Sequence, residues 1–175
     1  MSELTMADLQ QSLAHIAGSP RDGGTVEMVV RRPTVDEREV VAEAEIRPGS
    51  GLVGDSWGTR PHPSSEAEIT LMNARCIALL AGDVDRWPLA GDQLYVDLDL
   101  SEENLPAGTR LRLGSVLLEV SAKPHTGCSK FSARFGPDAL GFVNDDDGRA
   151  MRLRGLNARV VEGGSVRTGD LVTKE

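Results

Sequence analysis

The residue best suited to carry out chemistry in this sequence is Cys128, one of two cysteines in the chain. It lies in residues 123–130 (KPHTGCSK), where proline, threonine and glycine indicate a loop at the end of a strand-like run. His125, Lys130 and Arg134 could place positive charge near the sulfur, and positive charge favours the thiolate, the form of cysteine that reacts and binds metals. The local sequence therefore favours a functional thiol over the common alternative, a small buried hydrophobic residue.

The second cysteine, Cys76, has a different setting. It falls within an expected helix at 73–81, near Ile77, Leu79 and Leu80. Apolar surroundings raise the pKa of a thiol and restrict access to it, so we interpret Cys76 as structural. Two cysteines are too few for a disulfide framework, and we expect both to be free thiols in a reducing compartment.

Other chemistries stay open around Cys128. A zinc site could combine Cys128 with His125 and His62, but His-x-x-Cys is a weak pattern without a second close pair of ligands. His125 and Cys128 could also form a nucleophilic Cys-His pair, and their spacing neither supports nor excludes it.

Two further segments invite a binding interpretation. Residues 51–55 (GLVGD) superficially resemble a phosphate loop but lack its Gly-Lys-Ser/Thr ending, so a turn is the simpler account. The basic residues of 152–155 (RLRG) and Arg159 could face an anionic cofactor, or they could balance the acidic run 145–147.

Composition limits the classes of function. The formal net charge of −8 and the aromatic content of 3% argue against a nucleic-acid partner. The charge also argues against an anionic membrane surface, and no run approaches the roughly 20 apolar residues of a membrane span. The first residues are acidic and polar, unlike a signal peptide, and we therefore expect a cytoplasmic protein.

The elements that must position Cys128 are mostly short strands. Strand-like runs occur at 26–31, 39–46, 67–72, 93–98, 110–113, 116–121, 156–161 and 169–173. Gly114 and Ser115 predict a two-residue hairpin turn, and 162–165 (EGGS) separates the last two runs. The Gly- and Pro-rich segment 48–63 predicts a long surface loop, a kind of loop that is often functional.

A helix is expected near the N-terminus. Apolar residues at helical spacing indicate an amphipathic helix at about 6–17, with Thr5 and Asp8 resembling a capping box and Gly18 near its end. We therefore expect residues 1–24 to form a helical extension and linker, and residues 25–175 to form a single, mainly β domain. Short strands with small inserted helices, without strand-helix alternation, favour a β-barrel.

Several short strings occur in an order that resembles the MOSC family, the module named for the C-terminal domain of molybdenum-cofactor sulfurases. The resemblance covers roughly residues 25–175. Its strings are 51–55 (GLVGD), 90–106 (AGDQLYVDLDLSEENLP), 108–114 (GTRLRLG), 127–131 (GCSKF), 134–136 (RFG), 153–161 (LRGLNARVV) and 168–170 (TGD).

The resemblance implies a β-barrel of the kind inserted in pyruvate kinases. It implies that Cys128 carries sulfur or ligates the molybdenum of a molybdopterin cofactor, and stand-alone members are similar to proteins that reduce N-hydroxylated substrates. Pyridoxal phosphate enters only at the level of the wider sulfurase family, and we expect this chain to lack that module and the iron-sulfur module.

These observations define the expected site. Cys128 is the candidate catalytic residue and metal ligand, because a thiolate is a soft ligand suited to transition metals. Candidate cofactor-binding residues are His125, Thr126, Gly127, Lys130 and Arg134, the last two chosen by their proximity to Cys128. Expected partners are a small-molecule cofactor or substrate and an electron-donor or sulfur-donor protein; the oligomeric state stays open. The alternative is a noncatalytic β-barrel that binds the cofactor or another anion.

Overall fold

The computed structural model describes residues 4–175, and within that range seven strands close into a barrel. Around the ring they follow the order β11, β7, β8, β9, β5, β6 and β1, with β1 pairing back to β11. Neighbouring strands are antiparallel except β5 and β6, which are parallel. The bounds of these strands are β1 Gly24–Arg31, β5 Ile69–Asn73, β6 Leu94–Asp97, β7 Arg110–Leu113, β8 Val116–Val120, β9 Leu156–Glu162 and β11 Leu171–Lys174.

Four further strands lie beside the barrel. β2 (Glu39–Val41) pairs with β1, while β3 (Glu43–Arg47) lies between β10 (Gly164–Arg167) and β4 (Gly51–Leu52) in a separate sheet. The expected β-barrel with inserted helices is confirmed.

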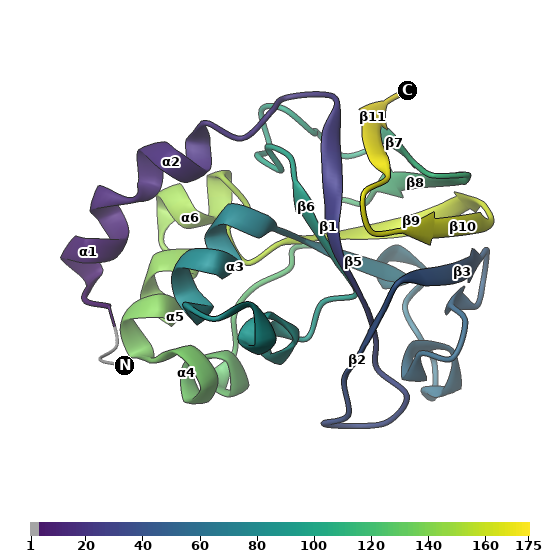
Figure 1. The fold of residues 1–175 in the computed structure, drawn as a ribbon, viewed down its shortest axis with the longest axis horizontal. Coiled ribbons are helices and arrows are strands. Elements are labelled where there is room, and N and C mark those ends of the chain that lie inside the picture. Colours follow the sequence, from purple (N-terminus) through teal and green to yellow (C-terminus); the bar gives the residue numbers. More distant parts are fainter. Residues whose placement is uncertain (1–3) are drawn as a thin grey trace.

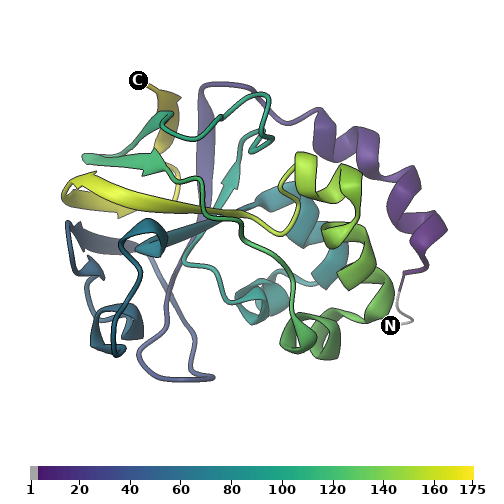
Figure 2. The same ribbon diagram turned by 180° about the vertical axis from the view of Figure 1, so that it is seen from behind.

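The helices gather on one side of the barrel, as Figures 1 and 2 show. α1 and α2 run along the outside of this helical layer, and α1 contacts α5. The helices are α1 Met6–Gln11, α2 Leu13–Ala17, α3 Ala74–Ala81, α4 Ser129–Phe135, α5 Pro137–Asn144 and α6 Asp146–Ala150, with 3-10 turns at Ser56–Thr59, Ser65–Ala67 and Val84–Ala90. No helix in residues 4–175 is long and apolar enough to cross a membrane.

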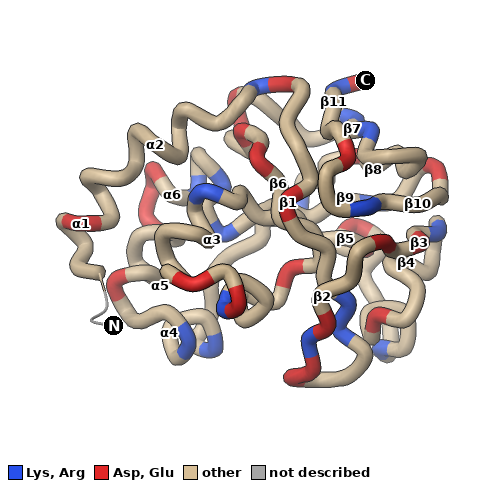
Figure 3. Tube along the Cα trace, viewed as in Figure 1, with Lys and Arg blue, Asp and Glu red and all other residues tan. Residues whose placement is uncertain are grey.

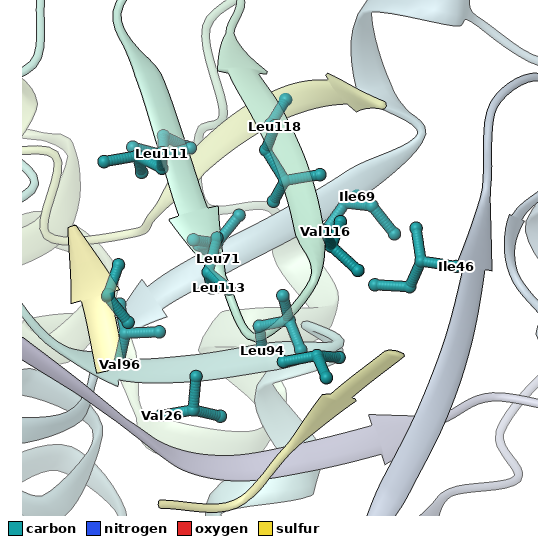
Figure 4. Close-up of a cluster of buried hydrophobic side chains, with 14 of the residues drawn as sticks. Val26, Ile46, Ile69, Leu71, Leu94, Val96, Leu111, Leu113, Val116 and Leu118 are labelled. Atoms are coloured by element: carbon teal, nitrogen blue, oxygen red, sulfur yellow. The ribbon is translucent and has the colours of Figure 1, made fainter. Parts of the chain in front are cut away.

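The barrel strands β5 and β6 are apolar on both faces, because one face packs in the barrel interior and the other packs against the helices. The barrel interior is filled by aliphatic side chains, including Leu71 of β5 and Leu94 of β6 (Figure 4). Met72 and Tyr95 point to the other face of the same strands and pack in a second cluster with the helices. Because successive strand residues face opposite sides, both faces of β5 and β6 exclude water.

Several local predictions are confirmed. The Thr5 side chain accepts a hydrogen bond from the Asp8 amide, and the Asp8 side chain accepts one from Thr5, which completes the capping box. Asn73 caps α3, and Gly82 follows its last residue. Gly114 lies in the hairpin turn between β7 and β8 with φ +56°, as such a turn requires.

Other boundaries differ from the expectation. The N-terminal helix is divided at Ser12, and the run 39–46 is divided into β2 and β3. The segment 48–63 contains the short strand β4 and a 3-10 turn. Gly164 and Ser165, which were expected in the separating segment 162–165, instead begin β10, because this strand pairs with β3. The helices of 129–150 were not expected, since their apolar positions are interrupted by glycines and charged residues.

Candidate functional site

Cys128 lies where the chain passes from the barrel to the helical layer. The segment 121–128 leaves β8 and crosses to α4, a path that is visible in Figure 2. Cys128 is the residue that precedes the first turn of α4, and its side chain is exposed. The expected loop therefore ends at Cys128, and Lys130 belongs to the helix.

Two asparagine side chains hold the backbone of this segment. Asn144 at the end of α5 accepts a hydrogen bond from the Gly127 amide (2.9 Å) and donates one to the Gly127 carbonyl (3.0 Å). The Asn157 amide of β9 donates to the carbonyls of Lys123 and Pro124, at 3.1 and 3.2 Å. A Cβ on Gly127 would lie 2.7 Å from Cδ1 of Leu140, so a side chain there would force Leu140 or the segment to shift.

The surroundings of Cys128 favour its thiolate. The amides of Phe131 and Lys130 face the sulfur from the first turn of α4 and lower the pKa of the thiol, although the side chain forms no capping hydrogen bond. The positive charges of Arg154 and Lys130 lower this pKa further, and partial burial opposes them. An exposed thiol with a lowered pKa combines the two properties that make a cysteine reactive.

His125 is fixed by a buried carboxylate. Its Nε2 lies 2.9 Å from Oδ1 of Asp92, a side chain with no exposed surface. The other carboxylate oxygen of Asp92 accepts a hydrogen bond from Arg154 at 2.5 Å. Burial alone would raise the pKa of Asp92, but Arg154 and His125 hold it well below its usual range. The ionised carboxylate therefore keeps the proton on Nε2 and leaves Nδ1 of His125 as an acceptor.

Arg154 links this pair to the helix that follows Cys128. Its guanidinium also donates to the Ala90 carbonyl (2.8 Å) and lies 5.0 Å from the centre of the Phe131 ring in α4. Arg154, which precedes β9, thus connects Ala90 and Asp92, which precede β6, to Phe131 in α4. These contacts fix the positions of both His125 and the Cys128 segment.

A cationic cavity of about 290 Å³ lies beside α4. It is lined by five basic side chains, by the hydroxyls of Thr34, Ser56 and Thr59, and by one acidic residue, Asp36; the basic residues are Arg32, Arg38, Arg60, Lys130 and Arg134. Figure 3 shows the corresponding basic segments on α4 and beside β2.

Arg38 stands out in this cavity because its charge is poorly compensated. Its Nε is buried and has no hydrogen-bond partner among the described residues. Burial lowers the pKa of Arg38, and the positive charges of Arg134 and Arg32 lower it further. An anion in the cavity would supply the missing acceptor and relieve this repulsion.

The Gly- and Pro-rich segment reaches the Cys128 region. Arg60 and His62 line a second cavity, of about 490 Å³, together with His125 and Thr126. The base of this segment is anchored by Asp55, which accepts hydrogen bonds from the Arg32 guanidinium at 2.9 and 2.7 Å.

The structure brings some of the predicted site residues together and separates Arg134 from Cys128. Residues 125–128 form one continuous segment, and Lys130 lies in the first turn of α4. Arg134 is at the far end of α4, where it donates to the Leu89 carbonyl (2.8 Å) and pairs with Asp36 (3.3 Å). Lys130 and Arg134 meet as walls of the cationic cavity.

The structure also tests the two interpretations of the basic residues 152–159, as a patch for an anionic cofactor or as partners of the acidic run 145–147. Arg154 pairs with Asp92, Arg159 with Glu119, and Arg152 donates to backbone carbonyls near Leu105. These arginines neither form one patch nor pair with the acidic run 145–147, where Asp145 instead caps α6.

No hydrogen bond joins His125 to Cys128 among the described residues, since Nε2 is bonded to Asp92. Within residues 4–175, no group of three or more His, Cys, Asp or Glu side chains is arranged to hold a metal ion by itself.

Sequence reasoning missed the buried polar residues behind the site, Asp92, Asp55 and Arg38. Asp92 and Asp55 do stand in the strings 90–106 and 51–55, each as an acidic residue beside glycine and next to a hydrophobic run. A carboxylate beside a buried apolar run requires a cation or a hydrogen-bond donor as its partner, and this requirement was the available signal for a buried ion pair. Arg38 carried no such signal.

Comparison with known proteins identifies the family of this chain. The family model described as "MOSC domain" matches residues 59–173, and the chain therefore belongs to the MOSC domain family, which is associated with molybdenum-cofactor sulfurase-type domains. Among curated proteins, none matches the chain.

Solved structures support the fold. YiiM from Escherichia coli is 18% identical with a TM-score of 0.58, and the match covers 86% of this chain and 69% of that one. The YuaD protein from Bacillus subtilis is 16% identical with a TM-score of 0.57, over 85% of this chain and 93% of that one. A third structure, described as a hypothetical protein, is 21% identical with a TM-score of 0.62, over 87% and 67%.

Proposed function

We propose that this protein binds a molybdopterin-type molybdenum cofactor, with the Cys128 thiolate as the ligand that the protein supplies to the metal. The observation that carries the proposal is the exposed Cys128, with its lowered pKa, two residues before Lys130, which lines a cationic cavity in an acidic chain. A soft thiolate suits a transition metal, and a phosphate group suits a cavity lined by arginine, lysine and hydroxyl groups.

The residues present fit such a cofactor. Arg38 and Lys130 are the residues that would hold its phosphate, because Arg38 has an unpartnered buried Nε and Lys130 forms no ion pair within residues 4–175. Arg32 is less available, since Asp55 already neutralises it. Thr126 and Gly127 would contact the cofactor through the segment that presents Cys128.

When bound, the cofactor would supply two-electron redox chemistry, and the protein would supply binding, orientation and proton transfer. His125 is suited to the last task, because Asp92 holds its ring and leaves Nδ1 free to accept a proton. We propose the reduction of N-hydroxylated substrates as the reaction, with electrons from a separate donor protein.

The same thiolate is suited to carry sulfur as a persulfide, and this is the second candidate function. The exposure of Cys128 favours it, since a sulfur carrier must meet a donor protein at its surface. Persulfide on Cys128 without molybdenum in the purified protein would favour this function over cofactor binding.

The test is the molybdenum and pterin content of protein expressed in cells that make the cofactor. Cys128→Ser should lose molybdenum, whereas the matched control Cys76→Ser should retain it if it folds. Lys130→Gln should retain the metal ligand but lower the pterin content. Equal molybdenum in the wild type and in Cys128→Ser would contradict the proposal.

A further inference from the structure

The 490 Å³ cavity beside the Cys128 segment has an unusual charge composition. None of its lining residues is acidic, although the chain carries a formal net charge of −8. Its basic or titratable side chains come from separate parts of the chain: Arg32, Arg60, His62, Lys123 and His125. Like charges repel one another, so gathering them around one hollow produces a positive potential that favours an anion.

The cations that face this cavity are largely uncompensated. Within residues 4–175, neither Arg60 nor Lys123 pairs with a carboxylate, whereas Arg32 is neutralised from behind by the buried Asp55. Arg60 and Lys123 lie on opposite segments, one before the strand β5 and one after β8. They are therefore free to contact the same ligand from two sides.

Part of the remaining lining is apolar and rigid, and the rest carries hydroxyl and amide groups. Trp57 is 4% exposed and is held by its amide, which donates to Asp55 at 3.1 Å. Pro61, Pro63 and Pro124 add walls whose backbone has little freedom. His62 has φ +52°, a left-handed conformation that is uncommon for a residue other than glycine and is often found at ligand sites.

The position of the cavity separates it from the cofactor phosphate site. The two cavities share Arg32 and Arg60, so they adjoin each other. Thr126 lines the 490 Å³ cavity and Lys130 lines the cationic one, and Cys128 lies between these two residues in the chain. The residues that would hold a cofactor, Cys128 and Lys130, thus follow directly in the chain on Thr126, a wall of the larger cavity.

We infer that the 490 Å³ cavity is the substrate pocket and that it selects small organic anions, compounds with a carboxylate next to a flat apolar group. Arg60 and Lys123 bind the carboxylate, and Trp57 with the prolines contacts the apolar part. The assignment to substrate rests on the proposed function, but the binding of an organic anion can be tested without the cofactor.

The test compares benzoate with benzamide, two probes of nearly the same shape that differ in charge. In a Trp87→Phe background, Trp57 is the only tryptophan, because the chain has two. Titration of the cofactor-free protein should give saturable quenching of Trp57 by benzoate, weakened by salt, and far weaker binding of benzamide. Equal binding of the two probes, or no saturable binding of benzoate, would overturn the inference.

Variants locate the binding. Arg60→Gln and Lys123→Gln should each weaken benzoate binding by roughly tenfold, the loss expected for one charge-assisted hydrogen bond. Arg21→Gln removes an exposed positive charge that lines neither cavity, so it is the matched control and should leave benzoate binding unchanged. Unaltered binding in both pocket variants would place the anion elsewhere and overturn the inference.

A final comparison separates this inference from the proposed function. Benzoate should still bind to the cofactor-loaded protein, because the pocket is for substrate; displacement of benzoate by the cofactor would contradict that assignment. If the protein binds benzoate at Arg60 and Lys123 but never acquires molybdenum, the anion pocket stands and the proposed function fails.

Discussion

The two cysteines occupy regions that differ in almost every property that controls a thiol. Cys76 lies in α3 with no exposed surface, and burial raises its pKa to about 12. Cys128 is exposed before α4, and nearby amides lower its pKa. Arg154 lowers the pKa of both thiols, so proximity to this cation does not distinguish them. Burial and the backbone amides at the start of α4 account for the difference.

The largest expected effect comes from removing Asp92, the counter-charge of the arginine that acts on both thiols. Asp92→Ala would leave Arg154 buried without its counter-charge and His125 without its partner. We expect the free energy of unfolding to fall by about 3–5 kcal/mol, the usual cost of leaving one partner of a buried ion pair uncompensated. Urea denaturation measures this change, and a loss below about 1 kcal/mol would show that Asp92 does not organise the site.

The same carboxylate predicts a pH dependence of stability. Because the pKa of Asp92 is lower in the folded protein than in the unfolded chain, its contribution is complete above the unfolded value of about 4 and is lost as the pH falls below it. The free energy of unfolding should therefore decline in acid below about pH 4. Asp92→Asn should show a smaller decline over that range, and an unchanged slope would contradict this role.

A smaller effect sharpens the contrast between the thiols. Cys76→Ser buries a hydroxyl among Ile77, Met72 and other apolar side chains of the helical cluster. We expect it to lower the free energy of unfolding by about 1–3 kcal/mol, the cost of burying a polar group without a good partner. Cys76→Ala serves as the control for lost volume alone.

The smallest effect on stability is expected at Cys128. Cys128→Ser changes an exposed side chain that makes no capping hydrogen bond, so the free energy of unfolding should change by less than about 0.5 kcal/mol. Thermal denaturation of the two serine variants side by side checks the ranking. A Cys128→Ser variant that is less stable than Cys76→Ser would reverse the comparison.

The sequence predicted the barrel better than it predicted the site. Alternation and turn residues located the strands, because hairpins such as the one at Gly114 are encoded by neighbouring residues. Cys128 could be chosen for the same reason, since its loop signals are local. The Asp92 and Arg154 pair could not be predicted, because its members are far apart in sequence and meet only when β6 and β9 enter the closed barrel. β10 was missed because its pairing with β3 depends on the fold and not on its own composition.

The most direct test of the central claim is the rate at which each cysteine is alkylated by iodoacetamide as a function of pH, read by peptide mass spectrometry on the folded protein. We expect rapid labelling of Cys128, with a midpoint below the ordinary thiol pKa of about 8.5, and labelling of Cys76 only after unfolding. Similar labelling of the two cysteines, or a midpoint for Cys128 above that value, would contradict the claim that the molecule presents Cys128 as its working thiolate.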